Sequence, residues 1–238
     1  MTTYVLRHGP TDYSRHYLVN GDPIKPVHLN EDGRRSLGRG WNSLPLHSVE
    51  TWVASAFPRA QQTANLPMGV PGPELIIDPR LNELDYGDFE GGPFLEYAAW
   101  LDEHGASERP PGSTESQIEG VRRMLTSVLA ALEHPGPRVL VAHGLLVSVL
   151  LWHSTRTPDQ PMPLFFPEAP YVEPVAISDE ELPERVRTLM KDLRAGAERG
   201  AADTSDGRLF RNGDGLAVAT VDPASPYHSQ VQKDLPHA

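Results

Sequence analysis

The chain has 238 residues, a formal net charge of −11 and no cysteine. Its length suits one α/β domain that buries roughly 70% of its unfolded-state surface. The lack of cysteine excludes disulfides, thiolate nucleophiles and iron–sulfur centres, and the negative charge disfavours nucleic acid or an anionic membrane as the main partner. We expect neither a secretory signal nor a membrane span, and therefore a cytoplasmic protein.

Predicted strands and helices alternate over residues 2–155. Short apolar or β-branched runs predict strands at residues 2–6, 51–55, 75–78 and 138–142. Apolar residues at helical spacing predict helices at residues 30–40, from 59 to 64, and at 93–104, 116–133 and 145–152. Residues 10–30 predict a long surface loop. The alternation favours an α/β fold, a three-layer α/β/α sandwich with a mainly parallel central sheet.

Residues 156–238 differ in character from the rest. Residues 157–174 are rich in proline and aromatic residues, residues 179–199 predict a charged amphipathic helix, and residues 215–221 predict an added strand. We interpret the chain as one domain, residues 1–238, with a core at 1–155. The C-terminal extension, 156–238, either covers the functional site as a lid or enlarges the core.

Basic side chains follow three of the predicted strands. His8, Arg59 and His143 lie where the strands end, and ligands of parallel sheets bind outside the carboxyl ends of the strands. A histidine there can attack phosphorus, and the neighbouring Arg7 can bind phosphoryl oxygens bidentately. Arg59 opens a helix whose N-terminus also favours an anion. Taken singly, these residues also fit a solvated loop histidine, a surface arginine and a buried structural histidine.

Four carboxylates lie within residues 82–91, and one of them could protonate a leaving oxygen. Composition alone does not choose among Glu83, Asp85, Asp88 and Glu90.

The motifs in combination resemble one family. They are Arg-His-Gly-x-Thr at residues 7–11, Leu-Asn-x-x-Gly at 29–33, Ser-x-x-x-Arg-Ala-x-Gln-Thr-Ala at 55–64, Glu-x-x-x-Gly-x-x-Glu-Gly at 83–91, Pro-x-Gly-x-x-Glu-Ser at 110–116 and Ala-His-Gly at 142–144. In this order they resemble the histidine phosphatase superfamily, in the branch that contains cofactor-dependent phosphoglycerate mutase and small-molecule phosphatases. The resemblance covers about the first 155 residues and implies a phosphoglycerate mutase-like fold.

The resemblance also implies roles for the matched residues. His8 would be the phosphorylated nucleophile, and Glu83 the general acid and then the base. Arg7, Arg59 and His143 would bind the phosphoryl group. The residues expected at the substrate are Ser14, Asn20, Gly21 and Gly144. Ser14 departs from the family pattern, which usually has asparagine at that position. No metal or other cofactor is implied.

The leading interpretation is a metal-independent phosphatase that acts on a small phosphorylated metabolite. The alternatives are a mutase, which would need further basic residues around the site, and a non-catalytic binder of phosphorylated ligands, which usually lacks the nucleophile or the acid. A zinc site made of His8, Glu83 and His143 is compatible by residue type but not by spacing. The identity of the substrate and the oligomeric state, a homodimer included, stay open.

Overall fold

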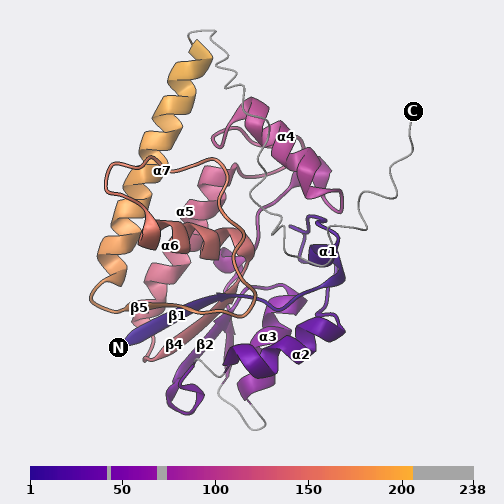
Figure 1. Cartoon of the computed structure of the whole chain (residues 1–238), viewed down its shortest axis with the longest axis vertical. Helices are drawn as coiled ribbons and strands as arrows, with labels where there is room; N and C mark the ends of the chain where they lie inside the picture. Colours follow the sequence, from indigo (N-terminus) through magenta and orange to yellow (C-terminus); the bar gives the residue numbers. More distant parts are fainter. Residues whose placement is uncertain (42–43, 69–73, 206–238) are drawn as a thin grey trace.

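The computed structural model describes residues 1–41, 44–68 and 74–205, and its centre is a five-stranded sheet (Figure 1). The strands follow the order β3-β2-β4-β1-β5. Their bounds are β1 Thr2–Arg7, β2 Thr51–Ala54, β3 Leu75–Ile77, β4 Arg138–Ala142 and β5 Val175–Ser178. The first four are parallel, and β5 runs antiparallel to β1 at the edge of the sheet.

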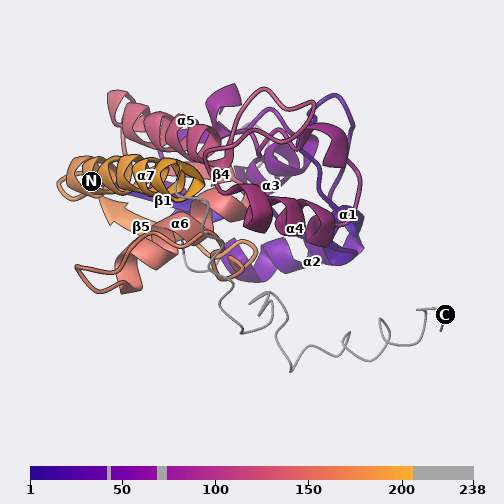
Figure 2. The same ribbon diagram turned by 90° about the horizontal axis from the view of Figure 1, so that it is seen from above.

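Helices cover both faces of the sheet. The helices are α1 Asp12–Arg15, α2 Glu31–Gly40, α3 Pro58–Met68, α4 Phe94–His104, α5 Gln117–Ala130, α6 Gly144–Thr155 and α7 Leu182–Ser205. Short 3-10 turns lie at Leu46–Ser48, Pro79–Leu81, Gly87–Phe89 and Ala131–Glu133. Helices α2 and α3 lie on one side of the sheet, and α5, α6 and α7 lie on the other (Figures 1 and 2).

Alternation along the strands creates the two cores. Leu6, Trp52 and Val141 point to the α2–α3 side, whereas Val5 and Leu140 point to the side of α5, α6 and α7. This two-residue period is the expected behaviour of β-strands that are buried on both faces. The α/β fold and its three layers, predicted from the sequence, are confirmed.

The helix boundaries have local causes. Ser116 accepts a hydrogen bond from the Glu119 backbone N–H, and the Glu119 carboxylate accepts one from the Ser116 backbone, so a capping box begins α5. Thr11 and Ser14 begin α1 in the same way. Helix α6 is apolar on nearly all sides over residues 145–152 and is buried along most of its length, as the sequence predicted.

Several sequence predictions need correction. The predicted loop at residues 10–30 contains the short helix α1, because Thr11 and Ser14 cap a turn that has no apolar periodicity. Strand β5 was not predicted, since it is a four-residue edge strand that follows a proline-rich segment. The amphipathic helix is α7 at Leu182–Ser205 rather than residues 179–199. The strand predicted at residues 215–221 lies outside the described residues.

The described part of the extension contributes to both the sheet and the helical layer. Strand β5 pairs with β1, and α7 packs beside α5 (Figure 1). Across residues 1–41, 44–68 and 74–205, no helix combines the length and the apolar character needed to cross a membrane.

Candidate active site

The register of the parallel strands brings the candidate residues together. Arg7 pairs with Ala142, and Ala54 pairs with Val141, so β1, β2 and β4 end at one edge of the sheet. His8, Ser55 and His143 are the next residues after these strands, and all three are at least 96% buried. The edge of the sheet therefore collects groups that are far apart in the sequence.

His8 is held with one ring nitrogen ready to react. Its Nδ1 lies 2.7 Å from the Gly9 carbonyl oxygen. Because that oxygen can only accept, Nδ1 carries the proton and Nε2 keeps its lone pair. Burial, and then the positive charges of Arg59 and Arg7, lower the pKa of His8 well below its ordinary value. The imidazole is therefore neutral near pH 7, with Nε2 as a nucleophilic atom.

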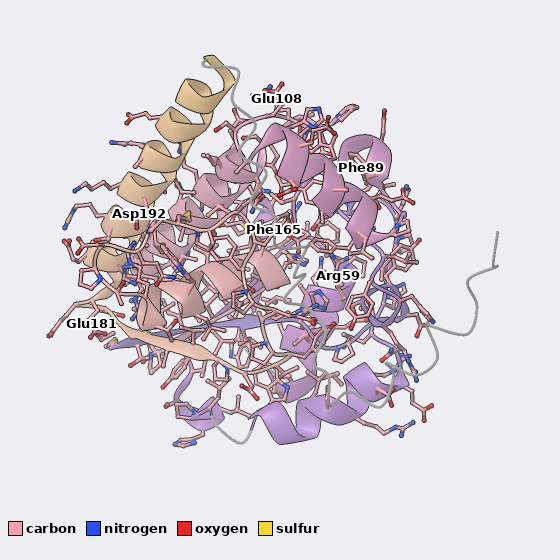
Figure 3. The ribbon with its side chains drawn as sticks, turned by 45° about the horizontal axis from the view of Figure 1, so that its top comes forward. Arg59, Phe89, Glu108, Phe165, Glu181 and Asp192 are labelled. Atoms are coloured by element: carbon pink, nitrogen blue, oxygen red, sulfur yellow. The ribbon has the colours of Figure 1, made fainter. Side chains whose placement is uncertain are left out.

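Arg59 lies in the first turn of α3 and forms hydrogen bonds to three other residues of the site. Its Nε donates to His8 Nε2 at 3.0 Å, and its terminal nitrogens donate to the Asn20 side-chain and main-chain oxygens and to His143 Nδ1. Burial lowers the pKa of Arg59 to about 10, so the guanidinium stays charged at neutral pH. The group lines a cavity of about 230 Å³ together with His8 and Phe165, and both Arg59 and Phe165 are labelled in Figure 3.

His143 supports Arg59 from the next strand. Its Nδ1 accepts from Arg59 at 3.3 Å, and its Nε2 lies 2.8 Å from Ser55 Oγ. The ring centroids of His8 and His143 are 5.2 Å apart. Burial, followed by the charge of Arg59, lowers the pKa of His143 well below its ordinary value. In this arrangement His143 is neutral and orients the guanidinium.

Arg7 is anchored by the C-terminal extension. One terminal nitrogen donates to the Glu168 carboxylate at 2.8 Å and to the Ala169 carbonyl at 2.7 Å, and the other donates to the Tyr171 hydroxyl at 2.8 Å. Its Nε is buried and has no hydrogen-bond partner among the described residues. A side chain at Gly144 would come within 3.5 Å of this Nε, so the glycine keeps the space beside it open.

Glu83 is the carboxylate that reaches the cavity. Of the four candidates in residues 82–91, only Glu83 lines the same cavity as His8. Burial raises its pKa, although the Leu84 N–H that donates to Oε1 at 3.0 Å acts in the opposite direction. A raised pKa lets the carboxyl hold a proton closer to neutral pH, as a general acid requires.

Comparison with known proteins identifies the family of this site. A family model described as histidine phosphatase superfamily (branch 1) matches residues 3–169. The chain belongs to this superfamily. The resemblance predicted from the sequence motifs is therefore confirmed.

Individual relatives of this histidine phosphatase superfamily protein include mutases and phosphatases. A probable phosphoglycerate mutase GpmB of Yersinia pestis is 28% identical over 159 residues, which cover 63% of this chain and 73% of the relative. A mycobacterial glucosyl-3-phosphoglycerate phosphatase, solved with VO3, is 25% identical with a TM-score of 0.60, covering 74% of this chain and 92% of the other. The alpha-ribazole phosphatase of Shigella flexneri shares the fold, with a TM-score of 0.59 at 23% identity and coverage of 75% and 90%.

The remaining predicted residues occupy different positions in this superfamily site. Asn20 binds Arg59 and also donates to Glu90 at 2.9 Å. Gly21 donates its N–H to Glu90 at 2.6 Å and lies outside the cavity that contains His8. Ser14 lines that cavity, but its hydroxyl also donates to the Thr11 carbonyl at 3.1 Å. Gly144 lines the cavity beside Arg7.

The sequence interpretation missed the residues that position Glu83. Arg123 of α5 donates to the carbonyls of Arg80, Asn82 and Glu83 at 2.8, 2.9 and 3.3 Å. It also pairs with Glu115 at 2.6 Å. Glu115 belongs to the motif at residues 110–116, so its side chain could have been assigned as a partner of a basic residue on the helix that follows. Across the described part of the chain, no three histidine or carboxylate side chains are grouped to hold a metal ion.

Proposed function

We propose that this protein is a metal-independent phosphatase that hydrolyses a small phosphomonoester through a phosphohistidine at His8. The observation that carries the proposal is the protonation of the His8 ring. The Gly9 carbonyl holds the proton on Nδ1, so Nε2 has a free lone pair, which accepts a hydrogen bond from Arg59. Glu83 lines the same cavity. Nucleophile, cation and acid therefore share one cavity, and the two arginines supply the positive charge that phosphoryl transfer requires.

In the first step, the Nε2 lone pair of His8 forms a bond to phosphorus as the bond from phosphorus to the alcohol oxygen breaks. Before this attack, the hydrogen bond that Arg59 Nε–H donates to His8 Nε2 is redirected to a phosphoryl oxygen, and Arg59 keeps its proton. The unpartnered Nε–H of Arg7 supplies a second donor. Glu83 gives its proton to the departing alcohol. The hydrogen bond from Nδ1 to Gly9 stays in place and stabilises the positive charge that develops on the ring.

In the second step, the Glu83 carboxylate removes a proton from a water molecule whose oxygen attacks phosphorus. The bond between phosphorus and Nε2 breaks, and its electron pair returns to His8. Inorganic phosphate leaves, and Glu83 is again protonated. Both groups regain their starting states, so the cycle needs no further reactant.

The second candidate is a mutase, which the 28% identical relative named as a probable phosphoglycerate mutase favours. A mutase must hold a second anionic group of its substrate while the phosphoryl group returns to another hydroxyl. Among the described residues that line the cavity, Arg7 and Arg59 are the only lysine or arginine side chains. Both serve the transferring phosphoryl group, so hydrolysis is the better supported reaction.

The test is phosphate release from phosphomonoesters in the presence of EDTA. We expect release by the wild-type protein and by His47→Ala, because His47 is exposed and lies in the 3-10 turn Leu46–Ser48, and no release by His8→Ala. Release that requires a metal ion, or that survives in His8→Ala, would contradict the mechanism. Isomerisation of 3-phosphoglycerate without release would establish the mutase.

A further inference from the structure

We infer that the site selects phosphomonoesters whose alcohol is uncharged and apolar, with a single aromatic ring as the best fit. This inference rests on the proposed phosphatase function and specifies its substrate class. It follows from three properties of the cavity beside His8: its walls, its entrance and its charges.

The walls of the cavity are mainly apolar and come from separate parts of the fold. They include Leu18 from the turn after α1, Phe94 and Tyr97 from α4, Leu145 from α6 and Phe166 from the C-terminal extension. The volume of about 230 Å³ is just below the range of typical ligand pockets, roughly 300–1,000 Å³, so the cavity suits a small group such as one ring. Such walls stabilise a substrate by removing apolar surface from water, and they offer few partners to a sugar or an acid.

Two exposed aromatic side chains lie at this cavity. Tyr17 is 44% exposed and Phe165 is 36% exposed, whereas most large apolar side chains of the described chain are buried. Both line the cavity although they lie far apart in the sequence. Exposed apolar surface that gathers at a cavity marks a binding site, because a ligand that covers it gains the burial.

The backbone holds Tyr17 at this place despite strain. Its φ of 54° is a left-handed conformation that residues with a side chain rarely adopt. The Phe94 N–H donates to the Tyr17 carbonyl at 2.7 Å, and the Leu18 N–H donates to Tyr13 at 2.9 Å. Strained residues that are held by their surroundings concentrate at functional sites. The position of Tyr17 is therefore built into the fold.

The segment that carries Phe165 is also fixed. Gln117 Nε2 donates to the Leu164 carbonyl at 3.1 Å, and Ser148 Oγ donates to the Pro167 carbonyl at 2.7 Å. Both donors are more than 90% buried, so the segment is anchored to the core on either side of Phe165. The aromatic wall is thus preorganised, and little conformational entropy is lost when a substrate binds.

The charges of the cavity oppose a second anionic group. Arg7 and Arg59 are the only lysine or arginine side chains among its described lining residues, and both lie beside the phosphoryl position. The other charged side chains of the lining are the carboxylates Glu83 and Glu168. A substrate carboxylate in the cavity would find no free cation and would be repelled by the Glu168 carboxylate. The alcohol part of the substrate is therefore uncharged.

The experiment compares kcat/KM for phosphate release from benzyl phosphate, glycerol 3-phosphate and 3-phosphoglycerate. All three are esters of primary alcohols, so leaving-group chemistry differs little and the comparison reports recognition of the alcohol. We expect benzyl phosphate to exceed each of the others by at least about 10-fold, the factor that corresponds to about 1.4 kcal/mol of binding.

A matched pair of variants tests whether Phe165 causes the preference for an aromatic alcohol. Phe165→Ala should lower the ratio of kcat/KM for benzyl phosphate over glycerol 3-phosphate by about 5-fold to 10-fold, a loss near 1 kcal/mol. Leu95→Ala removes a side chain that is 56% exposed on α4 and does not line the cavity, so the ratio should stay at the wild-type value.

The outcomes separate this inference from the function on which it rests. Release that depends on His8 but favours 3-phosphoglycerate or glycerol 3-phosphate would leave the phosphatase standing and overturn the apolar substrate class. An unchanged substrate ratio in Phe165→Ala would also overturn it. A folded wild-type protein that releases phosphate from none of the three esters would overturn the proposed function itself.

Discussion

Gly21 lies where the loop after α1 crosses the segment that carries Glu83. A Cβ at this position would lie 1.8 Å from the Leu84 carbonyl oxygen and 2.9 Å from its carbon. Real Cβ contacts begin near 3.0 Å, so Gly21→Ala must separate the two backbones by more than 1 Å. Asn20, which holds Arg59, and Glu83 are the adjacent residues on the two segments. Because a misplacement of about 1 Å can lower a rate about 10²-fold, we expect kcat/KM to fall by that factor.

Gly91→Ala is the matched control for this perturbation. Gly91 has a φ of 81°, and a Cβ there would have no neighbour within 4 Å. The substitution should therefore lower the free energy of unfolding by about 1–2 kcal/mol without displacing the site.

The assay measures kcat/KM for phosphate release, together with urea unfolding, for Gly21→Ala and Gly91→Ala. We expect Gly91→Ala to keep the wild-type kcat/KM per folded molecule. A folded Gly21→Ala variant with a kcat/KM close to that of the wild type would refute the reasoning, because the close approach would then not set the positions of Arg59 and Glu83.

Three further predictions concern the reacting groups. Burial and the charge of Arg59 hold the pKa of His8 below 6.5, and a protonated Nε2 cannot attack. The acid limb of the pH profile of kcat/KM should therefore lie below pH 6.5. An acid limb at higher pH would contradict a neutral His8. Glu83→Gln should lower kcat for alkyl phosphates about 10²–10⁴-fold. With p-nitrophenyl phosphate the variant should instead show a burst of nitrophenol, because this leaving group needs no proton while hydrolysis of the phosphohistidine still needs the base. An unaffected rate without a burst would exclude Glu83 as the acid and base. Arg123→Lys keeps the positive charge, but a lysine cannot reach three carbonyl oxygens and Glu115 together. We therefore expect kcat to fall about 10-fold while KM changes little. A change confined to KM would show that Arg123 acts on substrate binding instead.

Local sequence patterns predicted the fold class and the candidate nucleophile of this protein. The run at residues 138–142 is apolar apart from Arg138 and forms the fully buried strand β4, because a strand covered on both faces needs no polar alternation. The triplet Arg7-His8-Gly9 follows such a strand, and strand ends are where parallel sheets bind ligands. The motif order then connected His8 with Arg59, Glu83 and His143, and the family that it implied is the one that matches the chain.

The tertiary structure decided which groups act together. Composition left four carboxylates in residues 82–91 equivalent, and the family resemblance singled out Glu83. The fold shows that Glu83 lines the cavity of His8 while Glu90 binds Asn20 and Gly21. The ion pair of Arg7 with Glu168 joins positions 161 residues apart, and no local pattern predicts such a contact.

The distance between interacting residues along the chain separates what the sequence determined from what it did not. Helical and strand periods, capping residues and motif spacing act over a few residues, so the chain itself reveals them. The aromatic wall, the state of His8 and the anchoring of Glu83 by Arg123 arise from contacts between distant segments, which the packing of the sheet and its helices creates only when the whole domain folds.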